Sequence, residues 1–455
     1  MATDSVLAVD FGTTNTTAVV LPNGSQPQRL KFGNDWRLPS AVFWAETGPI
    51  VGVNAERSQR LDPTRFLRCP KREMGHTFVP LGEQQVPVVT VLSTLLSEVR
   101  RETAQQLGGF PKKVILTWPV LWAESRQMVF RNAALASGFT TVEYLEEPVA
   151  AAIRIGSLAQ VQQGKPFAIL DFGGGTLDVA VLVRDRSTFR VLASDGADPL
   201  GGEDIDDLLY DYAVSRLTDR RAAKHLINPS EPSWRSHAAA LRSNCCLAKE
   251  QLSEMGWGAI GIPHTGEDIV LKLAEFETLA SETLQRAVGK LAETIAQSDY
   301  KPRAVPVYFV GGSSRIAALP RLVHQQLGCT VELIGDPQFV VSEGAALWLG
   351  SRLGGEDLRV SWTERATSSA RVISEEARKA SQQAADVISE VSRRAAEQAA
   401  NARRELAKRA EDVTEKIQEK VERVSPDHPN VPVWVWVLLA VAALMVLVLI
   451  LPMFM

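Results

Sequence analysis

The sequence predicts an α/β fold built from two similar halves. Short apolar stretches typical of strands alternate with stretches of helical periodicity through residues 1–352. One unit occurs twice, at 6–20 and at 167–183: an apolar run, an aspartate, a small polar or glycine-rich turn, and a second apolar run. The copies start about 160 residues apart, which indicates a duplicated domain with one ligand held between the halves.

The second copy, FAILDFGGGTLDVAVLV, has the residues that indicate what the ligand is. Asp171 ends the first strand, and Gly173, Gly174 and Gly175 form the turn. Glycines let backbone N–H groups approach an anion closely, and an aspartate at a strand end suits a hydrated divalent cation. The stretch predicts a phosphate-binding hairpin, with an ordinary Gly-rich hairpin as the alternative. Because the glycines join strand to strand and no Gly-Lys-Ser/Thr follows, neither a Rossmann fingerprint nor a Walker loop is present.

The other elements of residues 1–352 follow from apolar periodicity and from breakers. In chain order we expect a loop then a strand over 31–44, a helix over 91–107, a strand over 113–118, a helix over 125–136 stopped by Gly138, a helix from Gly201 and Gly202 to about Leu217, helices over 234–300 broken by a strand pair near 258–273, and a strand over 305–314 ending in a glycine turn before a helix near Ile316.

Composition narrows the class of protein. The net charge of −4 gives no bulk basic field, so no nucleic-acid partner is expected. The four cysteines have no zinc-ligand spacing, which predicts reduced thiols in a cytosolic domain. The N-terminus has no basic region followed by an uninterrupted apolar run, so it is not a signal peptide.

Residues 353–424 change character, because glycine becomes scarce and Ala, Glu, Arg and Ser dominate. Apolar positions repeat every 11 residues, as in the series Ile373, Ala384, Ala395, Leu406 and Ile417. An 11-residue period of about 3.67 residues per turn predicts a straight or slightly right-handed helical coil. The Ala-rich seam allows self-association through the coil, and a lone solvated helix is the alternative. Residues 425–432, SPDHPNVP, form a linker.

Residues 433–451 are 19 apolar residues without a charge. At about 1.5 Å per residue this length nearly matches a bilayer core of about 30 Å. Trp434 and Trp436 lie at one end, where interfacial aromatics are common. The stretch predicts a single transmembrane tail anchor, with Lys/Arg-rich sequence before it keeping residues 1 to about 430 in the cytoplasm.

Five motifs resemble, in order, those of one family, the DnaK-type seventy-kilodalton heat-shock chaperones of the actin and sugar-kinase superfamily. They are VDFGTTNT, YLEEPVAAAI, ILDFGGGTLD, PLGGEDIDD and YFVGGSSRI. The resemblance covers the nucleotide-binding domain, about residues 5–350. It implies an actin-like ATPase fold of two ribonuclease-H-like lobes around a nucleotide cleft, with ATP or ADP and Mg²⁺ as ligands. Lobe I is expected at about 1–155, lobe II at about 156–335 and a closing helix at about 336–352.

The resemblance also implies roles for individual residues. Asp10 and Asp171 would hold hydrated Mg²⁺, with a structural capping role as the alternative for either. Lys71 would reach the γ-phosphate, or be a solvated loop lysine; Glu147 would orient the attacking water, with Asp178 nearby. Phosphate donors are expected at Gly12, Thr13, Thr14, Asn15, Gly173, Gly174, Gly175 and Thr176, of which Thr176 also counts among the catalytic residues. The remaining nucleotide contacts are expected at Gly201, Gly202, Glu203, Lys249, Ser253, Gly311, Gly312, Ser313 and Arg315.

This sequence departs from the family pattern on the adenosine side. The family usually has Glu where Cys246 stands, Arg where Glu250 stands, and an acidic residue where Gln338 stands. We therefore expect weaker ATP binding or an altered base preference. Beyond Leu353 we expect no peptide-binding β-sandwich. Pro119 and Arg126 match positions that the family uses for interdomain signalling, and here they keep either that role with a separate partner or only a role in the fold.

The expected function is a membrane-anchored ATPase switch that binds and slowly hydrolyses ATP. Lobe closure would signal to a separate protein partner or client. Two alternatives stay open: an actin-like polymer at the membrane, and a nucleotide-binding scaffold with little hydrolysis. A sugar kinase is disfavoured because no sugar-site constellation is present. Exchange factors and J-type co-chaperones are implied only by analogy.

Overall fold

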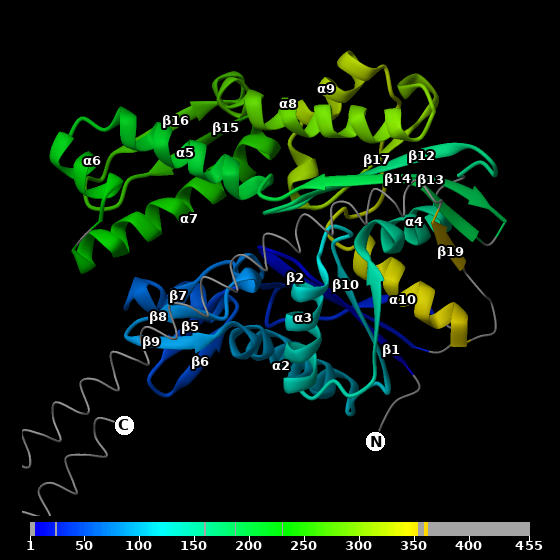
Figure 1. Ribbon diagram of the computed structural model, residues 1–455. Helices are drawn as coiled ribbons and strands as arrows, with labels where there is room; N and C mark the ends of the chain where they lie inside the picture. The colour runs from blue at the N-terminus through cyan, green and yellow to red at the C-terminus, as the bar shows by residue number, and fades with distance from the viewer. Residues whose placement is uncertain are drawn as a thin grey trace, which may run out of the picture. The chain divides into compact units, whose positions relative to one another are not determined.

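The structure is a computed structural model, and it describes residues 5–22, 25–158, 161–186, 188–229, 231–353 and 359–362. Two six-stranded sheets form its framework (Figure 1). The first has the order β11-β10-β1-β2-β3, with β4 also paired to β2, and the second has the order β18-β17-β12-β13-β14-β19. The described chain is therefore mixed α/β, as its sequence predicts.

The two sheets share one topology. In each, an antiparallel hairpin, β1–β2 or β12–β13, has its first strand flanked by parallel strands and its second strand flanked by an antiparallel one. The strands of the first sheet are β1 (Val6–Phe11), β2 (Asn15–Leu21), β3 (Gln28–Arg29), β4 (Arg37–Pro39), β10 (Lys113–Trp118) and β11 (Val142–Glu146). Those of the second are β12 (Pro166–Phe172), β13 (Leu177–Asp185), β14 (Thr188–Ala197), β17 (Val307–Val310), β18 (Val331–Leu333) and β19 (Arg359–Trp362).

Two helices, α4 (Glu147–Leu158) and α10 (Val340–Leu353), pack between the sheets (Figure 1). One face of each sheet contributes to this shared core, for example Ala8 and Ile115 from the first and Ile169 and Tyr308 from the second. Alternation of side chains along each strand sends the intervening residues to the opposite faces. There, α2 (Val88–Leu107) and α3 (Glu124–Ala136) cover the first sheet, and α5 (Gly202–Arg216), α8 (Leu273–Gln297) and α9 (Ala318–Leu327) cover the second.

The remaining elements extend these two layers. The first half also has α1 (Val53–Ser58), β5 (Val42–Ala45), β6 (Gly48–Val51), β7 (Phe66–Leu67), β8 (Phe78–Leu81), β9 (Gln84–Pro87) and the 3-10 turns η1 (Pro63–Arg65) and η2 (Pro70–Gly75). The second half has α6 (Arg220–Ile227), α7 (Pro232–Met255), β15 (Trp257–Gly261), β16 (Asp268–Lys272), η3 (Pro302–Ala304) and η4 (Gly312–Arg315). The predicted strand over 113–118 and the helices over 91–107 and 125–136 are confirmed within a few residues.

One expectation for the C-terminal segment is wrong. The sequence pattern predicts a helical coil from residue 353, but Arg359–Trp362 form the strand β19, which pairs in parallel with β14. The residues Arg-Val-Ser-Trp alternate polar and apolar character with the period of a strand, and the outer edge of β14 supplies a hydrogen-bonding partner. The 11-residue repeats from Ile373, the linker and the apolar stretch 433–451 lie outside the described residues. None of the helices in the described part combines the length and apolar character that a membrane crossing requires.

Candidate functional site

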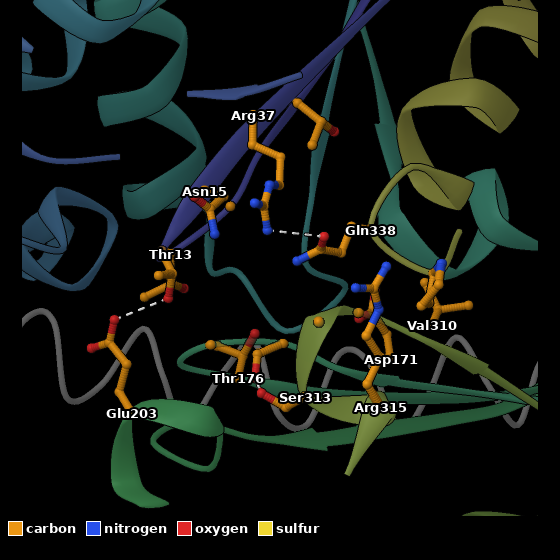
Figure 2. Close-up of a pocket in the computed structure, with 18 of the residues that line it drawn as sticks. Thr13, Asn15, Arg37, Asp171, Thr176, Glu203, Val310, Ser313, Arg315 and Gln338 are labelled. Atoms are coloured by element: carbon orange, nitrogen blue, oxygen red, sulfur yellow. Dashed lines mark hydrogen bonds between the residues drawn. The ribbon is translucent and has the colours of Figure 1, made fainter. Parts of the chain in front are cut away.

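A pocket of about 480 Å³ lies where the two hairpins meet. Both halves of the described chain supply its walls, and Figure 2 shows Thr13 and Asn15 facing Thr176 and Ser313 across it. The predicted site residues that line it are Asp10, Gly12, Thr13, Thr14, Asn15, Lys71, Glu147, Asp171, Gly173, Gly174, Thr176, Glu203, Lys249, Ser253, Gly311, Gly312, Ser313 and Arg315.

The floor of the pocket is formed by the two hairpins in equivalent registers. Asp10 stands opposite Thr17 on the neighbouring strand, and Asp171 stands opposite Asp178. The turns approach each other so closely that a Cβ built on Gly174 would lie 1.9 Å from the hydroxyl oxygen of Thr14. The glycine turn is thus required for the contact between the halves, and it leaves backbone groups facing the pocket.

A buried ion pair lies beside the floor of the pocket. The Nζ atom of Lys71, in η2, lies 2.9 Å from Oε1 of Glu147, the first residue of α4. The two side chains are 6% and 7% exposed. Burial lowers the pKa of Lys71, but the charges of Glu147 and Asp10 outweigh burial and raise it overall. Lys71 is therefore a protonated, buried cation and not a solvated loop lysine.

Three aspartates surround this pair with more negative charge than it can neutralise. Burial, followed by the charge of Glu147, raises the pKa of Asp10 to about 7, and Thr117 donates a 2.8 Å hydrogen bond to its Oδ1. Burial and Glu147 likewise raise the pKa of Asp178 to about 8 and that of Asp171 well above its ordinary value. Oδ1 of Asp178 is buried and has no hydrogen-bond partner among the described residues.

This donor set fits a divalent cation. Four carboxyl groups, those of Asp10, Glu147, Asp171 and Asp178, lie around the single ammonium group of Lys71, and carboxylate oxygen is the ligand type that Mg²⁺ prefers. In the described part of the chain, no three His, Cys, Asp or Glu side chains are arranged to hold one ion together. Asp10 and Asp171, at equivalent strand positions, are the residues that would hold a hydrated ion.

The opposite end of the pocket is polar and charged. Lys249 Nζ lies 2.8 Å from Oδ1 of Asp206 and donates a 2.7 Å hydrogen bond to the carbonyl of Gly202. Arg315 pairs with Asp336 at 2.7 Å. All three departures from the family pattern, Cys246, Glu250 and Gln338, line this end.

Glu203 connects the two halves across the pocket. From the first turn of α5 it accepts a 3.0 Å hydrogen bond from the Thr14 hydroxyl and a 2.7 Å hydrogen bond from the Cys69 thiol. Arg72 lies 3.6 Å from its second carboxylate oxygen. Burial and the charge of Glu203 raise the pKa of the Cys69 thiol well above its ordinary value, so this cysteine is a proton donor to the carboxylate.

Four predicted residues lie behind the pocket surface and do not line it. Asp178 is on the strand next to Asp171; Gly175 and Gly201 pack turn against turn; Gly202 contributes its carbonyl to Lys249. Other lining residues are not among those predicted from the sequence: Thr17, Arg37, Asp206, Glu254, Val310, Ile316, Pro337 and Val341. Thr17 could have been found from the duplication, because it occupies the position of Asp178. Asp206 follows Glu203 by three residues on one helix face. No sequence signal marks Arg37.

Comparison with known proteins agrees with this architecture. The family model described as "Hsp70 protein" matches residues 79–360. The chain is similar to the chaperone protein DnaK of Metamycoplasma hominis, 28% identical over 367 residues, and to that of Mycoplasmopsis synoviae, 29% identical over 367 residues. Each match covers 78% of this chain and 60% of the relative. DnaK of Thermotoga petrophila is 24% identical over 350 residues, which cover 75% of this chain and 58% of that protein. The chain thus spans about 60% of the length of these curated relatives. Since the family model covers more than half of its residues, the chain belongs to the Hsp70 family.

Proposed function

We propose that the pocket binds ATP with Mg²⁺ and hydrolyses it slowly, and that the two halves change their closure with the nucleotide. The observation that carries this proposal is the buried Lys71–Glu147 pair beside Asp10, Asp171 and Asp178, at the junction of two glycine-rich or small-residue turns. Phosphoryl transfer depends mainly on positioning and on neutralising charge, and this arrangement supplies both.

Each group of the floor has a distinct task in this proposal. The turn residues Thr13 and Thr176, and the backbone N–H of Thr14, donate hydrogen bonds to phosphate oxygens, and the Lys71 ammonium attracts the γ-phosphate. The Glu147 carboxylate, held by Lys71, accepts a hydrogen bond from the attacking water and so orients it toward phosphorus. Bound Mg²⁺ would supply positive charge against the phosphates, with Asp10 and Asp171 as its protein partners. Because the carboxylates are fixed by burial, little reorganisation is needed when the reaction begins.

Two contacts support a switch that depends on the relative position of the halves. Arg126, in α3, forms an ion pair with Asp198 at 2.7 Å. Thr14 and Cys69 of the first half donate hydrogen bonds to Glu203 of the second. In addition, β19 joins the C-terminal segment to β14, which pairs with the strand that carries Asp178. We propose that a separate protein partner or client senses this closure. The activities and partners of full-length DnaK proteins belong to this chain only as part of this proposal.

We further propose that residues 433–451 anchor the protein in a membrane, with residues 1 to about 430 on the cytoplasmic side. The uncharged apolar length of the segment and its two terminal tryptophans support this proposal. The helical repeats before it would act as a spacer that self-associates or remains single.

Single-turnover hydrolysis of ATP by the full-length protein in mild detergent tests the proposed activity. We expect Glu147→Gln and Lys71→Met to keep ATP binding within about tenfold and to slow hydrolysis by about 100-fold or more, the loss typical of removing a group that acts on the reacting atoms. Glu143→Gln is the matched control, because Glu143 is a half-buried carboxylate on the same strand-to-helix segment, outside the pocket, and pairs with Arg352.

The result separates the alternatives. Binding without hydrolysis by the parent protein would reject the enzymatic role and favour a nucleotide-binding scaffold. Sedimentation of the parent as a polymer in the presence of ATP would favour the actin-like alternative.

A further inference from the structure

Arg37 is an arginine of the pocket that the proposed chemistry does not use. It begins β4, where it stands opposite Thr17 of β2, and its side chain is 32% exposed. Asp35 holds its guanidinium group: Nε lies 3.2 Å from Oδ1 and NH2 lies 3.2 Å from Oδ2. NH1 donates a 3.3 Å hydrogen bond across the pocket to Oε1 of Gln338 (Figure 2).

These contacts fix the orientation of the guanidinium plane. Its edge nitrogens are used by Asp35 and Gln338, and no aromatic ring of the described residues lies over its flat face. A guanidinium plane that is fixed at its edges is suited to stack on an aromatic ring, which an ammonium group cannot do in the same way.

The surroundings of Arg37 place it at the end of the pocket away from the phosphate chemistry. The charges that act on it are those of Asp35, Glu250 and Asp336, whereas those that act on Lys71 are Glu147, Asp10 and Asp178. Figure 2 shows Arg37 and Arg315 extending from opposite sides toward the space beside Gln338. If triphosphate oxygens occupy the floor, the base of the nucleotide lies at this end.

We infer that Arg37 stacks on the base of the bound nucleotide from the first half of the molecule, and that it is a specificity-determining residue of this pocket. The inference rests on the proposed function. Since Gln338, Arg315 and Glu250 belong to the second half, the base is held between the halves, and its binding favours their closure. Glu250 acts as a counter-charge to Arg37 from α7 and does not contact the phosphates.

The experiment compares two ligands that differ only in the base. Binding of ATP and of ribose 5′-triphosphate to the full-length protein, each with Mg²⁺, is measured by calorimetry for the parent, Arg37→Ala, Arg37→Lys and Asp35→Asn. We expect Arg37→Ala to weaken ATP binding about tenfold and ribose 5′-triphosphate binding less than about twofold, in line with the usual worth of stacking. Arg37→Lys keeps the charge without the plane and should behave like Arg37→Ala.

Asp35→Asn retains Arg37 but loosens its guanidinium group, so ATP binding should fall about threefold with little change for ribose 5′-triphosphate. Arg101→Ala is the control, because Arg101 is exposed on α2 and pairs with Glu98 and Glu102 of its own helix. Equal losses for both ligands would mean that Arg37 acts on the phosphates and would overturn the inference, as would unchanged ATP binding in Arg37→Ala. If the parent binds neither ligand, the proposed function fails as well; if it binds both equally, only the base contact is rejected.

Discussion

At the scale of single residues, Asp178 shows the conflict between stability and function most directly. Its carboxyl group is buried one strand away from Asp171, and one of its oxygens has no hydrogen-bond partner among the described residues. Burial and the charge of Glu147 raise its pKa from 3.8 to about 8. In the unfolded chain the group ionises near its ordinary pKa, so between about pH 4 and pH 8 the folded state binds more protons than the unfolded state. The free energy of unfolding contributed by this group must therefore fall as the pH rises through this window.

Replacing Asp178 by Asn should remove that pH-dependent cost. Without metal or nucleotide, we expect Asp178→Asn to raise the free energy of unfolding by about 2 kcal/mol at pH 8 and by much less at pH 4.5. Urea unfolding in EDTA at the two pH values measures the difference. Asp185→Asn, at the exposed end of the same strand, serves as the control and should show no such dependence. An equal effect at both pH values would mean that ionisation is not its cause.

At the scale of elements, the two hairpin turns determine the shape of the pocket floor. Gly174 is placed so that a Cβ would come within 1.9 Å of Oγ1 and 3.0 Å of Cβ of Thr14. Rotation of the Thr14 side chain moves Oγ1 but not Cβ, so the backbone must shift to relieve the second contact. The sequence marks the glycine triplet as a turn. It does not reveal that the middle glycine is required because the other hairpin lies against it.

We expect Gly174→Ala to separate the two turns and to weaken binding of ATP with Mg²⁺ by about tenfold or more, because small displacements of positioning groups are costly. Gly289→Ala is the matched control, since Gly289 lies in α8 and an added Cβ there meets no atom within 4 Å. That change should leave ATP binding unaltered and stabilise the protein by about 0.5–1 kcal/mol. Fluorescence titration and thermal unfolding of both variants test the comparison; wild-type affinity in Gly174→Ala would show that the turns tolerate separation.

At the scale of the whole molecule, the proposed membrane anchor at residues 433–451 is tested by extraction from membranes. We expect the full-length protein to resist extraction from membranes by alkaline carbonate, and a variant lacking residues 433–451 to be released, because the uncharged stretch has the length of a bilayer core. Deleting residues 384–405, two complete 11-residue repeats, keeps the register of the coil and is the control. Extraction of the full-length protein by carbonate would contradict the anchor, and so would membrane retention of the variant that lacks residues 433–451.

The sequence by itself determined the α/β class, the duplicated hairpin and most residues of the pocket, because strands, glycine turns and strand-end aspartates are local patterns with a short period. It failed at Arg359–Trp362, where a four-residue alternation was hidden beside a long helical repeat and only the free edge of β14 decides for a strand.

Only the tertiary structure decided which distant residues meet. It joined Lys71 to Glu147, brought Glu203 to Thr14 and Cys69, and placed Arg37 beside Gln338. These pairs are separated by long stretches of chain, and no local pattern encodes them. Their distances follow from how two sheets pack against α4 and α10, and the raised pKa values of Asp10, Asp171 and Asp178 follow from the burial and shared charge that this packing imposes.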